Sequence, residues 1–132
     1  MANEAVQIIA PKYTITRQCN DAVAIAKGTL LRLSGTNFVV PSAVSGEPFG
    51  GIATEEKVAS DGVLTIGCAY CDGVFDLKNS SSATPAVGTK VCLSGANMYR
   101  AAVAGDLLTG AVIGELEELG TSTGTDRVRL LP

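Results

Sequence analysis

Two segments of the sequence decide the fold, because one is nearly a copy of the other: Lys27-Gly28-Thr29-Leu30-Leu31-Arg32-Leu33-Ser34-Gly35-Thr36-Asn37 and Val87-Gly88-Thr89-Lys90-Val91-Cys92-Leu93-Ser94-Gly95-Ala96-Asn97. They align without a gap, residue 27 with residue 87. Each contains a Gly-Thr turn, a short apolar run typical of a strand, and a Ser-Gly turn. Such an internal repeat indicates a duplicated supersecondary unit.

The repeat extends outward from these segments. Phe49-Gly50-Gly51-Ile52-Ala53 resembles Leu108-Thr109-Gly110-Ala111-Val112, and Gly62-Val63-Leu64-Thr65-Ile66 is loosely similar to residues 125–130. Asp61-Gly62 predicts a hairpin turn between short apolar runs, since Gly tolerates a positive φ there. Residues 62–77 predict one long bent strand or two consecutive strands. The expected fold class is all-β, a small barrel or sandwich with two pseudo-repeated halves and little or no helix.

Helical signals are weak throughout. Residues 55–59 and 114–119 offer a single turn at most, and we interpret both as strand ends or turns. The Gly-rich stretches at residues 49–51 and 105–110 lack the pattern of a phosphate-binding loop and predict turns or bulges. Six aromatic residues are scattered singly along the chain, which favours core positions over a stacking platform.

The expected domain organisation is an N-terminal arm, residues 1–12, and a single β domain, residues 13–132. The repeat spans about residues 22–78 and 83–132 of that domain. The Ser-rich stretch at residues 79–85 predicts a connecting surface loop. Neither half is long enough to bury a core alone, so the two are expected to fold together.

Composition narrows the function classes. The chain has 132 residues, 46% hydrophobic and 17% charged, with a net charge of −3 and no cluster of Lys and Arg. A nucleic-acid partner is therefore not expected. No apolar run has the length of a signal peptide or a membrane span, so we expect no membrane partner and synthesis in the cytoplasm.

Catalytic motifs are not found in the sequence. The chain has no His, which removes the commonest general base and a frequent metal ligand. Glu55-Glu56 and Glu117-Glu118 are adjacent carboxylates, but neighbours in a strand point to opposite faces and are better interpreted as solvated. We predict no catalytic residue, no cofactor and no enzyme activity.

Cys68-Ala69-Tyr70-Cys71 is the one motif with a sharper alternative. A redox pair of this spacing normally opens a helix, whereas this one lies in a predicted strand. Cys19 and Cys92 could complete a four-thiolate zinc site, but such sites usually present two close pairs of ligands. We expect structural thiols and no metal site; thiol-redox or zinc binding remains an alternative.

The order of these segments resembles that of the small head decoration, or capsid cement, proteins of tailed viruses. The resemblance rests on residues 24–33, 48–62 and 73–77, and on the closing pattern of residues 110–114 and 125–130. It covers nearly the whole chain from about Tyr13, and its specificity lies in order and spacing. The CxxC pair is a departure from the family's pattern.

The resemblance implies a structural virion protein, commonly a homotrimer, that binds the major capsid protein on the outer surface of an assembled head and stabilises the head. Multivalent binding by many copies would make weak contacts effective. A virion-displayed β domain that binds glycans or the host is an alternative function.

The candidate capsid contact is the N-terminal arm. Val6, Ile8 and Ile9 form an apolar segment outside the repeat, and we expect them, with Tyr13, to contact the capsid or a neighbouring subunit by strand addition. The alternative is an ordinary first strand within the protomer.

Overall fold

The structure is a computed structural model that describes residues 3–80, 85–122 and 124–130. It confirms the all-β fold class, with one short helix in the described part. The strands are β1 (Val6–Ile9), β2 (Ile15–Cys19), β3 (Leu30–Leu33), β4 (Phe38–Pro41), β5 (Phe49–Ala53), β6 (Thr65–Ala69), β7 (Val74–Asn79), β8 (Lys90–Leu93), β9 (Met98–Ala101), β10 (Val112–Ser122) and β11 (Thr125–Leu130); the helix is α1 (Ala104–Thr109).

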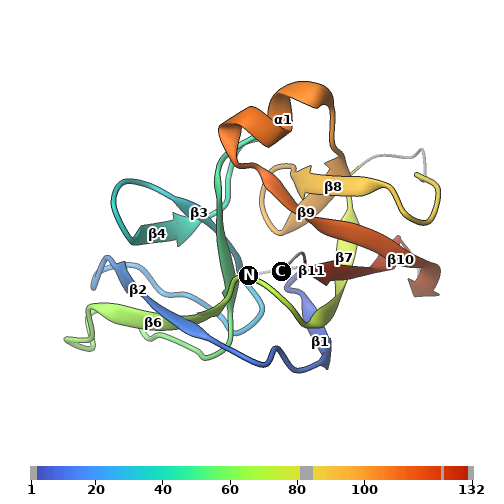
Figure 1. The fold of residues 1–132 in the computed structure, drawn as a ribbon. Helices are drawn as coiled ribbons and strands as arrows, with labels where there is room; N and C mark the ends of the chain where they lie inside the picture. Colours follow the sequence, from blue (N-terminus) through green and yellow to red (C-terminus); the bar gives the residue numbers. More distant parts are fainter. Residues whose placement is uncertain (1–2, 81–84, 123, 131–132) are drawn as a thin grey trace.

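The strands close into two barrels of five strands that lie side by side (Figure 1). The first barrel has the order β2-β4-β3-β5-β6, and the second has the order β7-β9-β8-β10-β11. Each barrel is closed by one parallel pair, β2 with β4 and β7 with β9. Closure removes the free sheet edges that an open arrangement of such short strands would leave.

The repeat holds at the level of strand register. Cys19 pairs with Val39 in the first barrel, and Asn79 pairs with Tyr99 at the same place in the second. The turns that precede β3 and β8 repeat the same hydrogen bond, from Thr29 N to Ala26 O at 3.1 Å and from Thr89 N to Ala86 O at 3.1 Å. The duplication predicted from the sequence is therefore a duplication of structure.

One part of the predicted repeat alignment is wrong. Leu108 does not correspond to Phe49, because Arg32 pairs with Phe49 in the first barrel and Cys92 pairs with Val112 in the second. The extra residues form α1, which ends at Gly110 with a φ of 74°. The segment 105–110, predicted as a turn or bulge, is thus mostly helical. Residues 49–51 do contain a bulge in strand β5, as predicted.

The predicted hairpin turn at Asp61-Gly62 is also wrong. β5 and β6 are antiparallel neighbours joined by residues 54–64, a loop rather than a two-residue turn. Lys57 holds this loop: its buried Nζ donates to Asp61 Oδ1 at 3.1 Å and to Asp21 O at 2.9 Å. The Asp61 side chain is therefore used to hold the loop around the ammonium group.

Neither glutamate-containing segment is helical, as predicted, but the second lies in the interior of a long strand rather than at a strand end or in a turn. Residues 55–59 form bends and an isolated bridge, and residues 114–119 lie within β10. The stretch 62–77 forms two consecutive strands, β6 and β7, separated at residues 70–73. Because β7 belongs to the second barrel, the boundary between the halves falls there rather than near residue 80. The predicted connecting loop lies partly outside the described residues, at 81–84.

The barrels share one large apolar cluster. Leu30, Phe49 and Ile52 of the first barrel pack in the same cluster as Val91 and Leu116 of the second. A smaller cluster that includes Leu31, Val39 and Ile66 fills the first barrel. Burial of aliphatic side chains of this size contributes roughly 1.5–3 kcal/mol each relative to exposure. The continuous core therefore holds the two halves together.

Backbone and side-chain hydrogen bonds fix the angle between the barrels. Leu30 N donates to the buried Asn97 Oδ1 at 2.9 Å, and Asn97 N donates to Ser42 Oγ at 3.2 Å. Gly46 N donates to Leu93 O at 3.0 Å across the same junction. Polar groups at this buried interface are thereby satisfied, which avoids the cost of a lost hydrogen bond.

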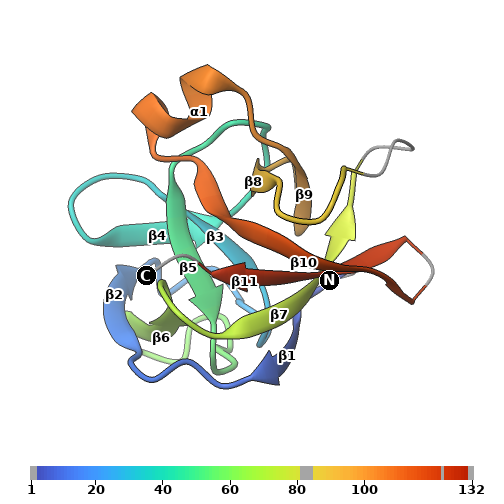
Figure 2. The ribbon, with the colours of Figure 1, turned by 45° about the vertical axis from the view of Figure 1, so that its right-hand side comes forward.

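The interior of the second barrel contains a hydrogen-bonded pair of polar side chains, whereas the cluster inside the first barrel is apolar. Tyr99 donates from its hydroxyl to Asp126 Oδ2, and both residues are buried. Burial and the hydrogen bond to Asp126 raise the pKa of Tyr99, so it stays a donor. The other carboxylate oxygen accepts from Gly120 N at 2.8 Å, which ties the long β10–β11 hairpin to the barrel (Figure 2).

The N-terminal segment is a strand within the protomer, which was the alternative to a free arm. β1 pairs antiparallel with β7, Val6 opposite Asp76 and Gln7 opposite Phe75. Ala5 is buried in the large cluster, and its N–H donates to Gly28 O at 2.8 Å. The segment therefore contributes to the fold. No helix in the described residues is long and apolar enough to span a membrane.

Candidate functional site

The side chains predicted to contact a partner form an exposed surface along β1. Val6 and Ile9 are each 58% exposed, Ile8 is 40% exposed and Tyr13 is 72% exposed. β1 lies on the outside of the second barrel, beside the start of β7 (Figure 2). We name these four residues the β1 surface.

The β1 surface arises from how β1 is attached. Within the described residues β1 pairs with β7 alone, so its second edge keeps backbone groups that another strand could pair with. An exposed edge with apolar side chains favours association unless something covers it. The geometry is suited to binding a partner and carries no reactive group.

The thiol motif does not form a reactive pair. Cys68 is fully buried in β6, whereas Cys71 lies half-buried after the strand, and all four cysteines are free thiols. Burial raises the pKa of Cys68 to about 12, against the opposing effect of Arg17. Because the thiolate is the nucleophile, this environment disfavours nucleophilic chemistry at Cys68. Burial also raises the pKa of Cys19.

Cys92 lies in the second barrel beside a different carboxylate. Its Sγ is 3.5 Å from Asp106 Oδ2, and Asp106 also forms ion pairs with Arg100 at 2.9 Å. Burial raises the pKa of Cys92 to about 12, while the hydrogen bond from Arg100 lowers the pKa of Asp106. In the described part of the chain, no three His, Cys, Asp or Glu side chains are grouped as metal ligands would be.

Lys57 is a buried cation that the sequence analysis missed. Burial alone would lower the pKa of Lys57, but hydrogen bonds to Asp61 and Asp21 outweigh it and raise the pKa. Its ammonium group has carboxylate and carbonyl oxygens around it and holds the loops at one end of the first barrel. We interpret it as structural, because the ammonium group is held by oxygen atoms of two loops.

Two shallow pockets lie on the first barrel. One, of about 420 Å³, is lined by residues 24–26 and 56–59. The other, of about 320 Å³, lies at the barrel end between Phe38 and Leu64, with Cys19 at its base. Both are lined mostly by apolar groups and hold no arrangement of acids, bases or nucleophiles.

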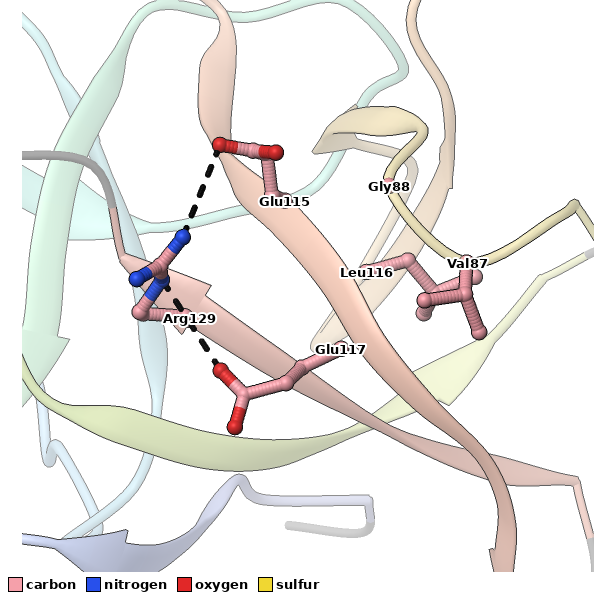
Figure 3. A pocket seen from close by; sticks show the side chains of 6 residues that line it. All are labelled: Val87, Gly88, Glu115, Leu116, Glu117 and Arg129. Atoms are coloured by element: carbon pink, nitrogen blue, oxygen red, sulfur yellow. Dashed lines mark ion pairs between the residues drawn. The ribbon is translucent and has the colours of Figure 1, made fainter.

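A third pocket lies on the second barrel beside Gly88 (Figure 3). Its volume is about 190 Å³, and it lies between the Val87-Gly88 turn and the strands β10 and β11. Arg129 Nη2 is 3.8 Å from Glu115 Oε2, and Arg129 Nε is 3.8 Å from Glu117 Oε2. Leu116, which is 1% exposed, also lines the pocket.

Two of the aromatic side chains, which are far apart in the sequence, meet in the fold. Phe49 and Tyr70 stack with ring centroids 5.8 Å apart, and the Arg17 guanidinium lies 4.9 Å from the centroid of Tyr70. Arg17 also donates to Gly50 O at 3.3 Å. This contact covers the bulge in β5. No local pattern in the sequence indicates this contact, because the three residues come from distant segments.

The comparisons with protein families and with curated proteins found no match. The site must therefore be interpreted from its own residues.

Proposed function

We propose that this protein is a non-enzymatic capsid decoration protein, which binds the outer surface of an assembled viral head and stabilises it. The major capsid protein is the proposed partner, and the exterior of the virion is the proposed location. The observation that carries the proposal is the order of turn and strand segments along nearly the whole chain, which resembles that of the decoration-protein family.

The β1 surface supports the proposal by offering a means of attachment. Val6, Ile8 and Ile9 are apolar yet exposed, and the strand that carries them has an available edge. A capsid segment that adds to this edge would satisfy backbone groups and cover the apolar side chains. The chemistry required is pairing and burial, with no catalytic group.

The fold supports the same role because its two closed barrels share one apolar core, so that both halves of a protomer form a single unit between neighbouring capsid subunits. Many copies on one lattice would convert modest individual contacts into strong reinforcement.

Co-sedimentation of purified protein with assembled heads tests the proposal. The variant Ile8→Asp/Ile9→Asp should fold normally but bind heads at least tenfold more weakly, because it introduces charge into the proposed contact and avoids a carboxylate at Val6, opposite Asp76. Val44→Asp is a matched control, since Val44 is 62% exposed on a loop of the first barrel. Heads that bind neither the unmodified protein nor the control would contradict the function; equal binding by all three proteins would contradict the contact alone.

A further inference from the structure

The two barrels carry equivalent surfaces at Gly28 and Gly88, and these surfaces have different surroundings. Gly28 in the first barrel and Gly88 in the second occupy the same position of the repeat, with φ angles of 89° and 92°. Their amides make equivalent hydrogen bonds, Gly28 N to Ala53 O at 2.8 Å and Gly88 N to Leu116 O at 2.7 Å. The backbone at the two positions is therefore equivalent, and the differences between them lie in the residues around them.

The N-terminal segment covers the first position. Ala5 N donates to Gly28 O at 2.8 Å, and an added Cβ on Gly28 would lie 2.3 Å from Ala5 O. Glu4 also approaches, with its Cβ 3.1 Å from that point. A short extended segment with a small side chain is thus bound against the glycine, and Gly28 is buried.

The second position is open in the described structure. An added Cβ on Gly88 would have no described atom within 4 Å, and Gly88 is exposed. The pocket of about 190 Å³ lies at this point, lined by Val87 and Leu116 (Figure 3). Among the described residues no backbone amide donates to Gly88 O, whereas Gly28 O accepts from Ala5.

The residues around the pocket select the kind of partner. In the first barrel, Leu30, Ile52 and Ala69 are neighbours across strands β3, β5 and β6 and are buried in the cluster shared with the second barrel. Strand register places charged residues at the corresponding points of the second barrel, namely Lys90, Glu115 and Arg129.

These charges are already paired with one another. Lys90 Nζ is 3.3 Å from Glu115 Oε2, and Arg129 Nη2 is 3.8 Å from the same oxygen. A charged rim of this kind disfavours docking of another apolar barrel face, because its ions would lose water. A narrow peptide segment can instead enter the pocket while the rim stays hydrated.

We propose that the pocket at Gly88 is a docking site for an extended peptide segment of a partner protein, which binds there as Glu4-Ala5 binds at Gly28. The segment donates a backbone N–H to Gly88 O and places a small apolar side chain beside Val87 and Leu116. Recognition comes from backbone pairing and shape, as in other strand-addition sites. The proposal does not depend on capsid binding.

The test uses the full-length ¹⁵N-labelled protein and a synthetic peptide with the sequence of residues 1–10, MANEAVQIIA. Titration should give saturable amide shifts at Gly88 and Leu116, with a dissociation constant below about 1 mM, the weak limit of specific affinities. A peptide in which Ala5 is replaced by Trp should bind with a dissociation constant at least tenfold higher, because the bulky side chain does not fit the pocket at Gly88.

A protein variant provides the second arm of the experiment. Val87→Arg should weaken peptide binding tenfold or more, whereas Val44→Arg, at an exposed position on the other barrel, should leave it unchanged. Absence of a saturable shift at Gly88 up to millimolar peptide would overturn the proposal. So would equal binding of the Trp peptide, or shifts confined to Gly28, where the peptide would only replace the chain's own segment.

Discussion

Cys68 and Cys71 share one short motif but lie in different surroundings. Cys68 is fully buried beside the Gly51 bulge, where an added Cβ on Gly51 would lie 2.7 Å from Cys68 Cβ. Cys71 is half-buried beyond the end of β6. The motif therefore consists of one thiol in the core and one half-buried thiol at the periphery.

Substitution should separate the two thiols. Cys68→Ser should reduce the free energy of unfolding by about 1–3 kcal/mol, because it places a more polar group in a tight core. Cys71→Ser should change it by no more than about 0.5 kcal/mol. Urea unfolding at pH 7 measures both; a larger loss for Cys71→Ser than for Cys68→Ser would contradict this assignment.

The pKa of Cys68 predicts a dependence of stability on pH. Its folded value of about 12 lies above the ordinary value of 9.0, so the unfolded state loses this proton first as pH rises. The stabilisation is therefore fully present below pH 9 and is lost as pH rises towards 12. Cys68→Ala should make the alkaline decline in urea-unfolding free energy shallower; an unchanged decline would contradict the burial effect.

At the scale of elements, Gly28 and Gly88 form a matched pair for experiment. Replacement by Ala places a side chain at a positive φ in both, at a cost of roughly 1–2 kcal/mol. Gly28→Ala also forces a Cβ to 2.3 Å from Ala5 O, whereas Gly88→Ala meets no described atom within 4 Å. Overpacking typically adds about 1–3 kcal/mol, so Gly28→Ala should be the more destabilising variant.

Thermal and urea unfolding of the two glycine variants, beside the unmodified protein, measures this difference. Equal destabilisation would show that the N-terminal segment does not lie against Gly28 in solution. The comparison controls for backbone strain, since the two φ angles differ by only a few degrees, 89° and 92°.

The sequence was sufficient to predict elements wherever the repeat was strong. The segments 27–37 and 87–97 fold alike because turn glycines and apolar runs recur at the same spacing. α1 was missed because a helix of six residues has too few turns for an apolar period. The strand β5 corresponds to β10 in the structure. The inserted helix residues, together with a bulge in each barrel, displaced the sequence alignment, so that β5 was matched with residues 108–112 instead.

The candidate site was predictable only in part. The exposed apolar character of Val6, Ile8 and Ile9 followed from their place outside the repeat, but their pairing with β7 did not, because strand pairing depends on distant residues. The pocket at Gly88 was implicit in the repeat. Recognising it required the structure, since the contact between Ala5 and Gly28 shows that one of the two equivalent positions is covered.

At the scale of the whole molecule, we predict a homotrimer. Large apolar side chains outside the β1 surface, among them Val63 at 45% and Leu64 at 60%, are also exposed, and a cyclic interface would cover them while the β1 surface stays available for the capsid. Light scattering of the purified protein at micromolar concentration should give three times the monomer mass. A monomer that stays monomeric when it binds heads would contradict this prediction.

The proposed function places this protein on the outside of an assembled head. An electron-microscopy map of the assembled particle is the sharpest test. Density for two adjoining five-stranded barrels should appear on the outer surface of the shell, at three-fold or quasi-three-fold positions. Density inside the shell, or an outer surface without this density, would rule the proposal out.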